Sequence, residues 1–143
     1  MTTIDRGLES ARLALKIGLG LAAFLAGLDK FFDLLADWSV YVSPLAKAAL
    51  PVSTTTFLHI VGVVEMVVGL AMLTRWTQVA SYVAMVWLAA IALNLITTGH
   101  FFDVAVRDVE MAIAAYALAR LTERREIHQA LAPPIRHAPT RAA

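Results

Sequence analysis

Four apolar runs of about 20 residues each fill most of this 143-residue sequence. They cover residues 11–32, 54–74, 77–97 and 101–121. At a helical rise of about 1.5 Å per residue, each run matches a hydrocarbon core about 30 Å thick. Four such helices would leave too little polar surface for a protein in water. The sequence therefore predicts an all-α integral membrane protein, folded as an antiparallel four-helix bundle in one domain, residues 1–143.

The composition agrees with this prediction and excludes several classes of protein. Hydrophobic residues make up 59% of the chain and charged residues 16%, whereas soluble domains carry about 25% charged residues. The formal net charge is only +1, so we expect no nucleic-acid partner. There is no cysteine, which excludes disulfides, thiolate metal sites and thiol chemistry by this chain itself.

The distribution of lysine and arginine predicts the orientation. With both termini in the cytoplasm, the inner side receives Arg6, Arg12, Arg75, Arg120, Arg124, Arg125, Arg136 and Arg141. The outer loops then keep only Lys30 and Lys47. Because positive charge concentrates on the cytoplasmic side, we expect the N-in, C-in arrangement.

The segment between the first two runs contains signals for a short helix. Ser43 is a suitable N-cap, Pro44 fits the first helical position, and Pro51 stops the helix. We therefore expect a short interfacial helix, LAKAAL, in the first outer loop. Residues 122–143 form a polar C-terminal tail, expected to be loose after Leu131.

Small and polar residues commonly mark the contact faces of helices in lipid, and each run carries such a stripe. The stripes comprise Lys16, Gly20, Ala23, Gly27 and Lys30 in the first run; Gly62, Glu65 and Gly69 in the second; Val83, Trp87, Ala90 and Asn94 in the third; and Asp103, Arg107, Glu110, Ala114 and Ala117 in the fourth. We expect all four stripes to face the interior of the bundle.

The polar groups of these stripes fall at one depth, in the outer half of the bundle. The predicted cluster consists of Lys30, Glu65, Asn94, Arg107, Asp108 and Glu110, with Asp29, His59 and Asp103 at its margin. A single charge at mid-membrane costs at least about 2.5–3.5 kcal/mol, so these groups must neutralise one another or line a wet cavity. Helical geometry allows Arg107 to meet Asp103, Glu110 or Glu65, and directs Asp108 to another neighbour such as Lys30. The cluster fits either helix-to-helix contacts or a ligand-binding or proton-binding site.

Two histidines raise the question of a haem site. His59 and His100 could ligate iron between helices, but no further ligand pattern accompanies them, and His100 follows Gly99 in a turn. The chain has no HExxH, Walker or GxGxxG spacing and no serine-centred elbow. We therefore predict no catalytic residue, no metal site and no bound cofactor, although a quinone fits the polar cluster.

Four motifs in order resemble the DoxX-like family of small bacterial membrane proteins. They are GLDKFFD, WSVYVSP, GVVEMVVGL and LNLITTGHFFDVAVRD, and the resemblance covers residues 12–121. It implies a four-span helical bundle in the cytoplasmic (inner) membrane. It also implies association with quinone-linked sulfur oxidation, as a subunit of thiosulfate–quinone oxidoreductase, or with assemblies that handle thiol and oxidative stress. The positions that fit the family's recurring polar pattern are Lys30, Glu65, Asn94, Arg107 and Asp108.

Three functional hypotheses follow. The first is an accessory or anchor subunit of a quinone-linked or sulfur-linked membrane redox system, with a polar pocket in the outer half of the bundle. Its partners would be the lipid bilayer and either redox proteins or further copies of the chain. The second is a purely structural assembly partner whose charges hold helices together. The third, a small-molecule transporter, is least favoured because the sequence has no broken-helix signal.

Overall fold

The computed structural model describes residues 3–131, and its elements are helical. They are α1 (Thr3–Asp29), the 3-10 helix η1 (Trp38–Tyr41), α2 (Pro44–Ala49), α3 (Thr54–Leu73), α4 (Thr77–Thr97) and α5 (Phe102–Leu131). No strand occurs within residues 3–131. The all-α prediction is confirmed.

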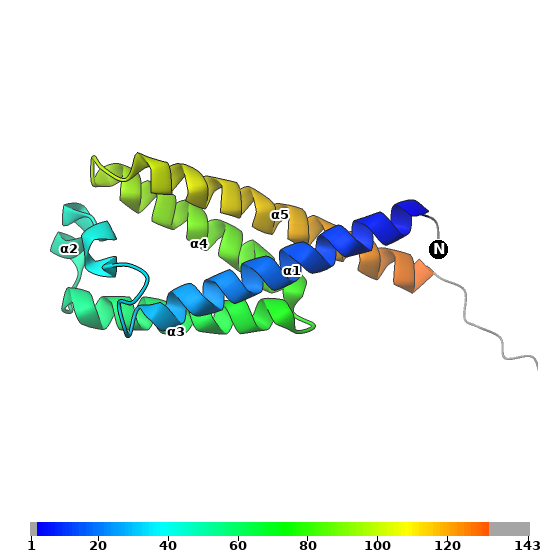
Figure 1. The fold of residues 1–143 in the computed structure, drawn as a ribbon, viewed down its shortest axis with the longest axis horizontal. Helices are drawn as coiled ribbons and strands as arrows, with labels where there is room; N and C mark the ends of the chain where they lie inside the picture. The colour runs from blue at the N-terminus through cyan, green and yellow to red at the C-terminus, as the bar shows by residue number, and fades with distance from the viewer. Residues whose placement is uncertain (1–2, 132–143) are drawn as a thin grey trace, which may run out of the picture.

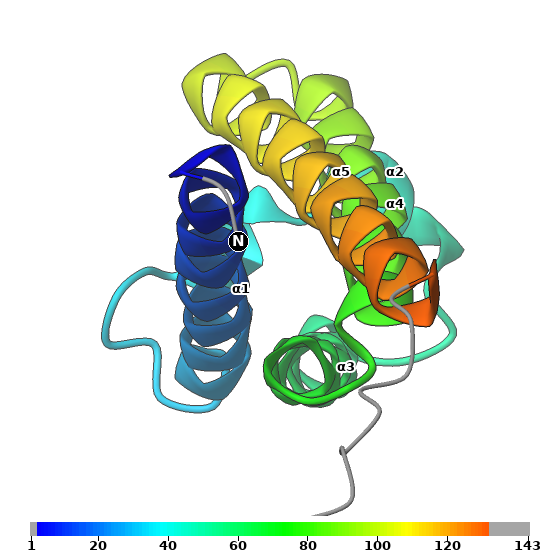
Figure 2. The same ribbon diagram turned by 90° about the vertical axis from the view of Figure 1, so that its right-hand side faces the viewer.

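The four long helices form two antiparallel pairs that cross each other. In Figure 1, α1 lies along α3, and α4 lies along α5. We call the end that carries Thr3 and Leu131 the termini end, and the end that carries η1 and α2 the loop end. α1 meets α5 in the half toward the termini end, where Glu9 pairs with Arg125, and Figure 1 shows the two helices diverging toward the loop end. Figure 2, seen from the termini end, shows that α1 and α5 cross rather than run parallel.

Within the described residues there are two hydrophobic cores, and the larger one joins the two helix pairs. The larger core contains Met72, Ala80, Ala84, Ala115 and Leu118. A smaller core of Ala92, Leu95 and Ala105 lies toward the loop end, where Tyr41 and Phe101 pack against it. Most of its members are small, which lets α4 and α5 approach closely.

The predicted contact faces are correct for α1 and α3. Gly20 and Gly27 are buried on α1, as is Lys30 just beyond its end, and Ala23 and Lys16 are partly buried. On α3, the whole stripe of Gly62, Glu65 and Gly69 is buried. Glycine at these positions lets the two backbones approach, so the stripes do mark the interface between these helices.

The predicted faces are wrong for much of α4 and α5. On α4, Val83 and Ala90 are exposed and Trp87 and Asn94 are only partly buried. On α5, Asp103, Arg107 and Glu110 are exposed. The faces that are buried instead consist of Thr77, Ala80, Ser81, Ala84, Ala92 and Leu95 on α4, and Ala105, Ala112, Ala115, Leu118, Ala119 and Thr122 on α5. Small alanine and serine side chains pack these helices together while the charges stay outside.

Two helix boundaries also differ from the prediction. The first helix begins at Thr3 rather than at residue 11 and ends at Asp29. The last helix continues to Leu131, so residues 122–131 are helical rather than part of a tail. Residues 132–143 of the predicted tail lie outside the described part of the chain. A salt bridge links the two extensions, because Glu9 in the first pairs with Arg125 in the second.

The short helix of the first loop forms as predicted. Ser43 accepts a hydrogen bond from the amide of Ala46, and Pro44 occupies the first turn of α2. The preceding η1 was not predicted; it begins after Asp37, whose carboxylate accepts the amide of Ser39.

Three of the helices are long and apolar enough to cross a membrane. They are the segments Ile4–Asp29, Thr54–Leu73 and Thr77–Thr97. Over its described residues α5 is long enough but less apolar than these three helices, because charged side chains lie toward both of its ends. The chain is therefore a helical protein with three apolar helices of spanning length.

Candidate functional site

The centre of the predicted cluster is a buried ion pair between α3 and the residue that follows α1. The ammonium of Lys30 lies 2.5 Å from Oε2 of Glu65, and the two side chains are 6% and 9% exposed. The indole N–H of Trp87 on α4 donates to the other carboxylate oxygen, at 3.5 Å. Both oxygens of Glu65 therefore have partners, and three separate parts of the chain meet at one carboxylate.

The cation of this pair is also held from the side of the first loop. The ammonium of Lys30 lies 3.7 Å from the centre of the Trp38 ring, a cation–π contact. It also donates to the carbonyl oxygen of Ala26, one turn back along α1. Lys30 thus contacts its own helix, the loop and α3 together, which leaves it little freedom to move.

Asp29 places the tryptophan over the lysine. Its carboxylate accepts the indole N–H of Trp38 at 2.8 Å and the amides of Leu34 and Leu35 at 3.0 Å. These bonds fold the chain back immediately after α1, because one buried carboxylate gathers three donors from the next nine residues. The sequence placed Asp29 at the margin of the cluster, and its observed role is to shape the loop.

Asp108 of α5 completes the cluster from the opposite helix pair. Its side chain is partly buried, and its carboxylate interacts electrostatically with Glu65, Arg107 and Lys30. Within residues 3–131 it forms neither a hydrogen bond nor a salt bridge. From the sequence we expected Asp108 to face a neighbour such as Lys30, and the structure agrees. Inside the bundle one cation, Lys30, therefore faces two carboxylates, while the exposed guanidinium of Arg107 acts on Asp108 from outside.

Asn94 binds the first loop and, within residues 3–131, makes no hydrogen bond to Lys30 or Glu65. Its side-chain amide donates to the carbonyl oxygen of Tyr41 at 2.7 Å, and its oxygen accepts the amide of Ser43 at 3.2 Å. These two bonds attach the loop to α4, whereas Asp29 attaches it to α1.

Three predicted members of the cluster lie elsewhere. Asp103, Arg107 and Glu110 are exposed on α5, and within the described residues Arg107 forms no salt bridge with either carboxylate or with Glu65. The prediction that they face the interior is wrong, because the alanine face of α5 packs on α4 and turns them outward. Only Asp108 of the four charges in this stretch points inward.

The two histidines occupy different surroundings. His59 is partly buried and stacks on Phe31, with ring centres 4.6 Å apart and planes 12° from parallel. His100 is exposed and meets the edge of Phe101. Among the residues that the structure describes, no three His, Asp or Glu side chains are grouped closely enough to hold a metal ion.

Several residues that complete the polar contacts were not in the predicted cluster, although Trp87 and Lys16 belong to the predicted stripes. Trp38 and Trp87 supply the ring and the N–H described above, and only their amphipathic character signalled such roles. Toward the termini end, Arg12 is 4% exposed and binds Glu9 through two hydrogen bonds of 2.9 and 2.7 Å. Lys16 donates to the carbonyl oxygen of Thr74, at the C-terminal end of α3.

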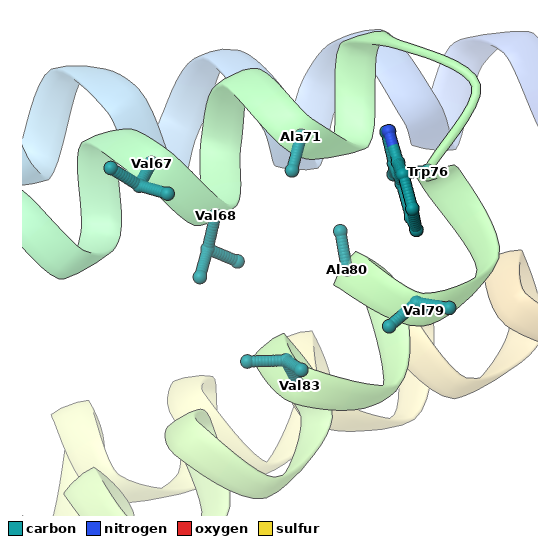
Figure 3. A pocket seen from close by; sticks show the side chains of 7 residues that line it. All are labelled: Val67, Val68, Ala71, Trp76, Val79, Ala80 and Val83. Carbon is teal, nitrogen blue, oxygen red and sulfur yellow. The ribbon is translucent and has the colours of Figure 1, made fainter.

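A separate cavity of about 190 Å³ lies between α3 and α4, toward the turn that joins them. Figure 3 shows its lining, which is almost wholly apolar: Val67, Val68, Ala71, Trp76, Val79, Ala80 and Val83. Because its lining carries almost no polar groups, the cavity cannot orient a polar ligand by hydrogen bonds. It belongs to the surface between the helix pairs rather than to the charged cluster.

No protein-family model, curated protein or solved structure matches this chain. The resemblance to the DoxX-like family therefore stays a hypothesis drawn from the sequence motifs.

Proposed function

We propose that this chain is a four-span protein of the cytoplasmic membrane, with both termini inside, and that it is an accessory subunit of a larger membrane assembly. Three helices of spanning length support insertion. The extensive packing of α5 along α4 supports a fourth span, since a helix held against a span by an alanine face shares its depth. The concentration of arginines at the termini end supports the orientation.

The observation that carries the accessory role is the division of the charges into two sets. The inner set, Lys30 and Glu65, is buried and paired within the chain. The outer set, Asp103, Arg107 and Glu110, is exposed on α5. Charges on the outward face of a span are costly in lipid unless a neighbouring chain covers them. The inner charges thus serve the fold, and the outer ones favour association.

The kind of assembly is proposed from the motifs alone. The DoxX-like motifs support a quinone-linked or sulfur-linked redox system as the partner. Because the chain has no cysteine, its part in such a system would be to anchor or to contact a quinone rather than to transfer thiol sulfur.

Insertion of α5 is tested by labelling single cysteines with a membrane-impermeant maleimide in intact spheroplasts. The chain is naturally free of cysteine, so each substitution gives one reporter. Ser39→Cys in the first loop should react from outside, and Arg124→Cys near the end of α5 should react only after lysis. Both residues are exposed. Labelling of both Ser39→Cys and Arg124→Cys from outside would show that α5 is not a span.

The accessory role is tested by mild purification from native membranes. We expect other membrane chains, whether different proteins or further copies of this one, to remain bound to the wild-type chain and to be lost from Arg107→Leu. A matched control is Val83→Leu, an exposed apolar position on α4. A wild-type chain that purifies without other chains would contradict the accessory role.

A second candidate function is binding of a polar headgroup, such as that of a quinone, beside Asp108. The favouring observation is that this partly buried carboxylate faces Lys30 and Glu65 yet makes no hydrogen bond within residues 3–131. A short-chain ubiquinone should then raise the melting temperature of the wild type in detergent and leave that of Asp108→Asn unchanged. Equal shifts, or none, would exclude this candidate.

A further inference from the structure

The exposed charges of α5 form one continuous stripe. Asp103, Arg107 and Glu110 are spaced at i, i+4 and i+7, which places them on the same side of the helix. Ala114 and Ala117 continue the stripe toward the termini end, and both are partly exposed. This pattern is that of a helix contact face, yet α5 uses a different face to pack on α4.

The stripe lies where the chain leaves α5 uncovered. Figure 1 shows that α1, which meets α5 toward the termini end, has moved away from it at the loop end, where residues 102–110 begin α5. Glu110 is eight residues from the start of α5 at Phe102, which is about 12 Å along the helix axis. A carboxylate so far from the helix end does not easily reach water from a lipid-facing position. Something polar must therefore lie against it.

We propose that a second copy of this chain packs on this stripe, α5 against α5, so that Arg107 of each copy pairs with Glu110 of the other. The proposal rests on insertion of α5 as a span, as proposed above. Both copies then have the same orientation in the membrane, and the two-fold axis runs along the membrane normal. Residues 107 and 110 are about 4.5 Å apart along the axis, a distance that an arginine side chain spans.

Charge complementarity favours a second copy as the occupant. The stripe carries both signs in sequence, so it is complementary to itself under a two-fold axis, and the same contact forms twice. Asp103 lies in the first turn of α5, where the helix N-terminus and the nearby surface stabilise its charge. The alanines that follow allow two helices to approach closely along the rest of the stripe.

Charge exchange tests this arrangement with two differently tagged copies expressed together. Copies that carry Arg107→Glu should co-isolate at least tenfold less than wild type, and so should copies that carry Glu110→Arg, because each places like charges across the interface. One copy of each variant, expressed together, should co-isolate again, since one copy then presents two carboxylates at these positions and the other presents two guanidinium groups. A contact within a single chain cannot produce this recovery.

The matched control is the exposed Arg120–Glu123 pair, which is also spaced at i, i+3 on α5 but lies off the stripe. Arg120→Glu should leave co-isolation unchanged. Ala114→Cys should give a disulfide-linked dimer under copper-catalysed air oxidation, whereas Val86→Cys on the exposed side of α4 should not.

The outcomes separate this inference from the proposed function. Wild-type copies that do not co-isolate, or a mixed pair that fails to recover, would overturn the α5 dimer even if other membrane chains still co-purify. Labelling of both Ser39→Cys and Arg124→Cys from outside would instead overturn the span itself, and with it both proposals. Each variant is first shown to be inserted by its resistance to alkaline carbonate extraction.

Discussion

Gly27 of α1 and Gly62 of α3 touch backbone to backbone. A β-carbon on either glycine would lie 2.5 Å from the carbonyl oxygen of the other. This contact also positions the ion pair, because Lys30 and Glu65 each follow one of the glycines by three residues. The close approach of two backbones thus brings one cation and one carboxylate together on a shared face.

The glycine contact predicts that Gly27→Ala destabilises the bundle. A methyl group there would meet the oxygen of Gly62 and the amide of Met66, both backbone atoms that cannot turn aside. We expect a loss of about 1–3 kcal/mol in the free energy of unfolding, the usual cost of overpacking. Circular dichroism of thermal or SDS unfolding in detergent measures it.

Gly18→Ala is the control for this substitution. Gly18 lies on the same helix, and apart from its chain neighbours and its own helix backbone no atom lies within 4 Å of the position that its β-carbon would take. Alanine there should leave stability unchanged or raise it by up to about 1 kcal/mol, since alanine is the better helix former. Equal losses for both variants would show that α1 and α3 are not in the described contact.

The buried ion pair predicts strong coupling between Lys30 and Glu65. Lys30→Met or Glu65→Leu alone should cost about 3–5 kcal/mol, because each leaves an uncompensated buried charge. The double variant should cost much less than the sum, since it removes both charges at once. A double-mutant cycle of unfolding free energies measures the coupling; additive losses would mean that the two side chains do not pair.

We predict that the side chain of Asn94 holds the first loop against α4. Asn94→Ala removes one bond from the carbonyl of Tyr41 and one to the amide of Ser43. We expect hydrogen exchange at Ser43 to speed up by about ten- to a hundredfold, corresponding to about 1.4–2.8 kcal/mol of lost protection. Thr97→Ala, which affects an exposed hydroxyl on the same helix, should leave the Ser43 amide protected.

We predict that Glu9 of α1 holds the last turns of α5 in place. Its carboxylate pairs with Arg12 at 2.7 Å and with Arg125 at 3.5 Å. Glu9→Ala leaves the buried guanidinium of Arg12 without its partner, so we expect residues 122–131 to become sensitive to limited trypsin digestion. Glu126→Ala, at an exposed position, is the comparison. Unchanged digestion of both would show that this contact does not hold the helices together.

Much of the fold could be predicted because lipid-length helices depend on local properties. The apolar runs predicted the four long helices, Ser43 and Pro44 predicted α2, and the glycine stripes predicted the faces of α1 and α3. The ends of the helices were predicted less accurately. Charged residues beyond residue 121 extend α5, and one of them, Arg125, pairs with Glu9 of α1, a contact that the local sequence does not show.

The sequence by itself determined that this chain is helical, which residues are small or charged, and that glycine and lysine recur on one side of α1, since each follows from helical spacing. Only the tertiary structure decided which charges lie inside. Arg107 and Asp108 are neighbours, yet one is exposed and the other faces Lys30. The reason is that a helix offers several faces of similar composition, and close packing of alanines against α4 selects one of them.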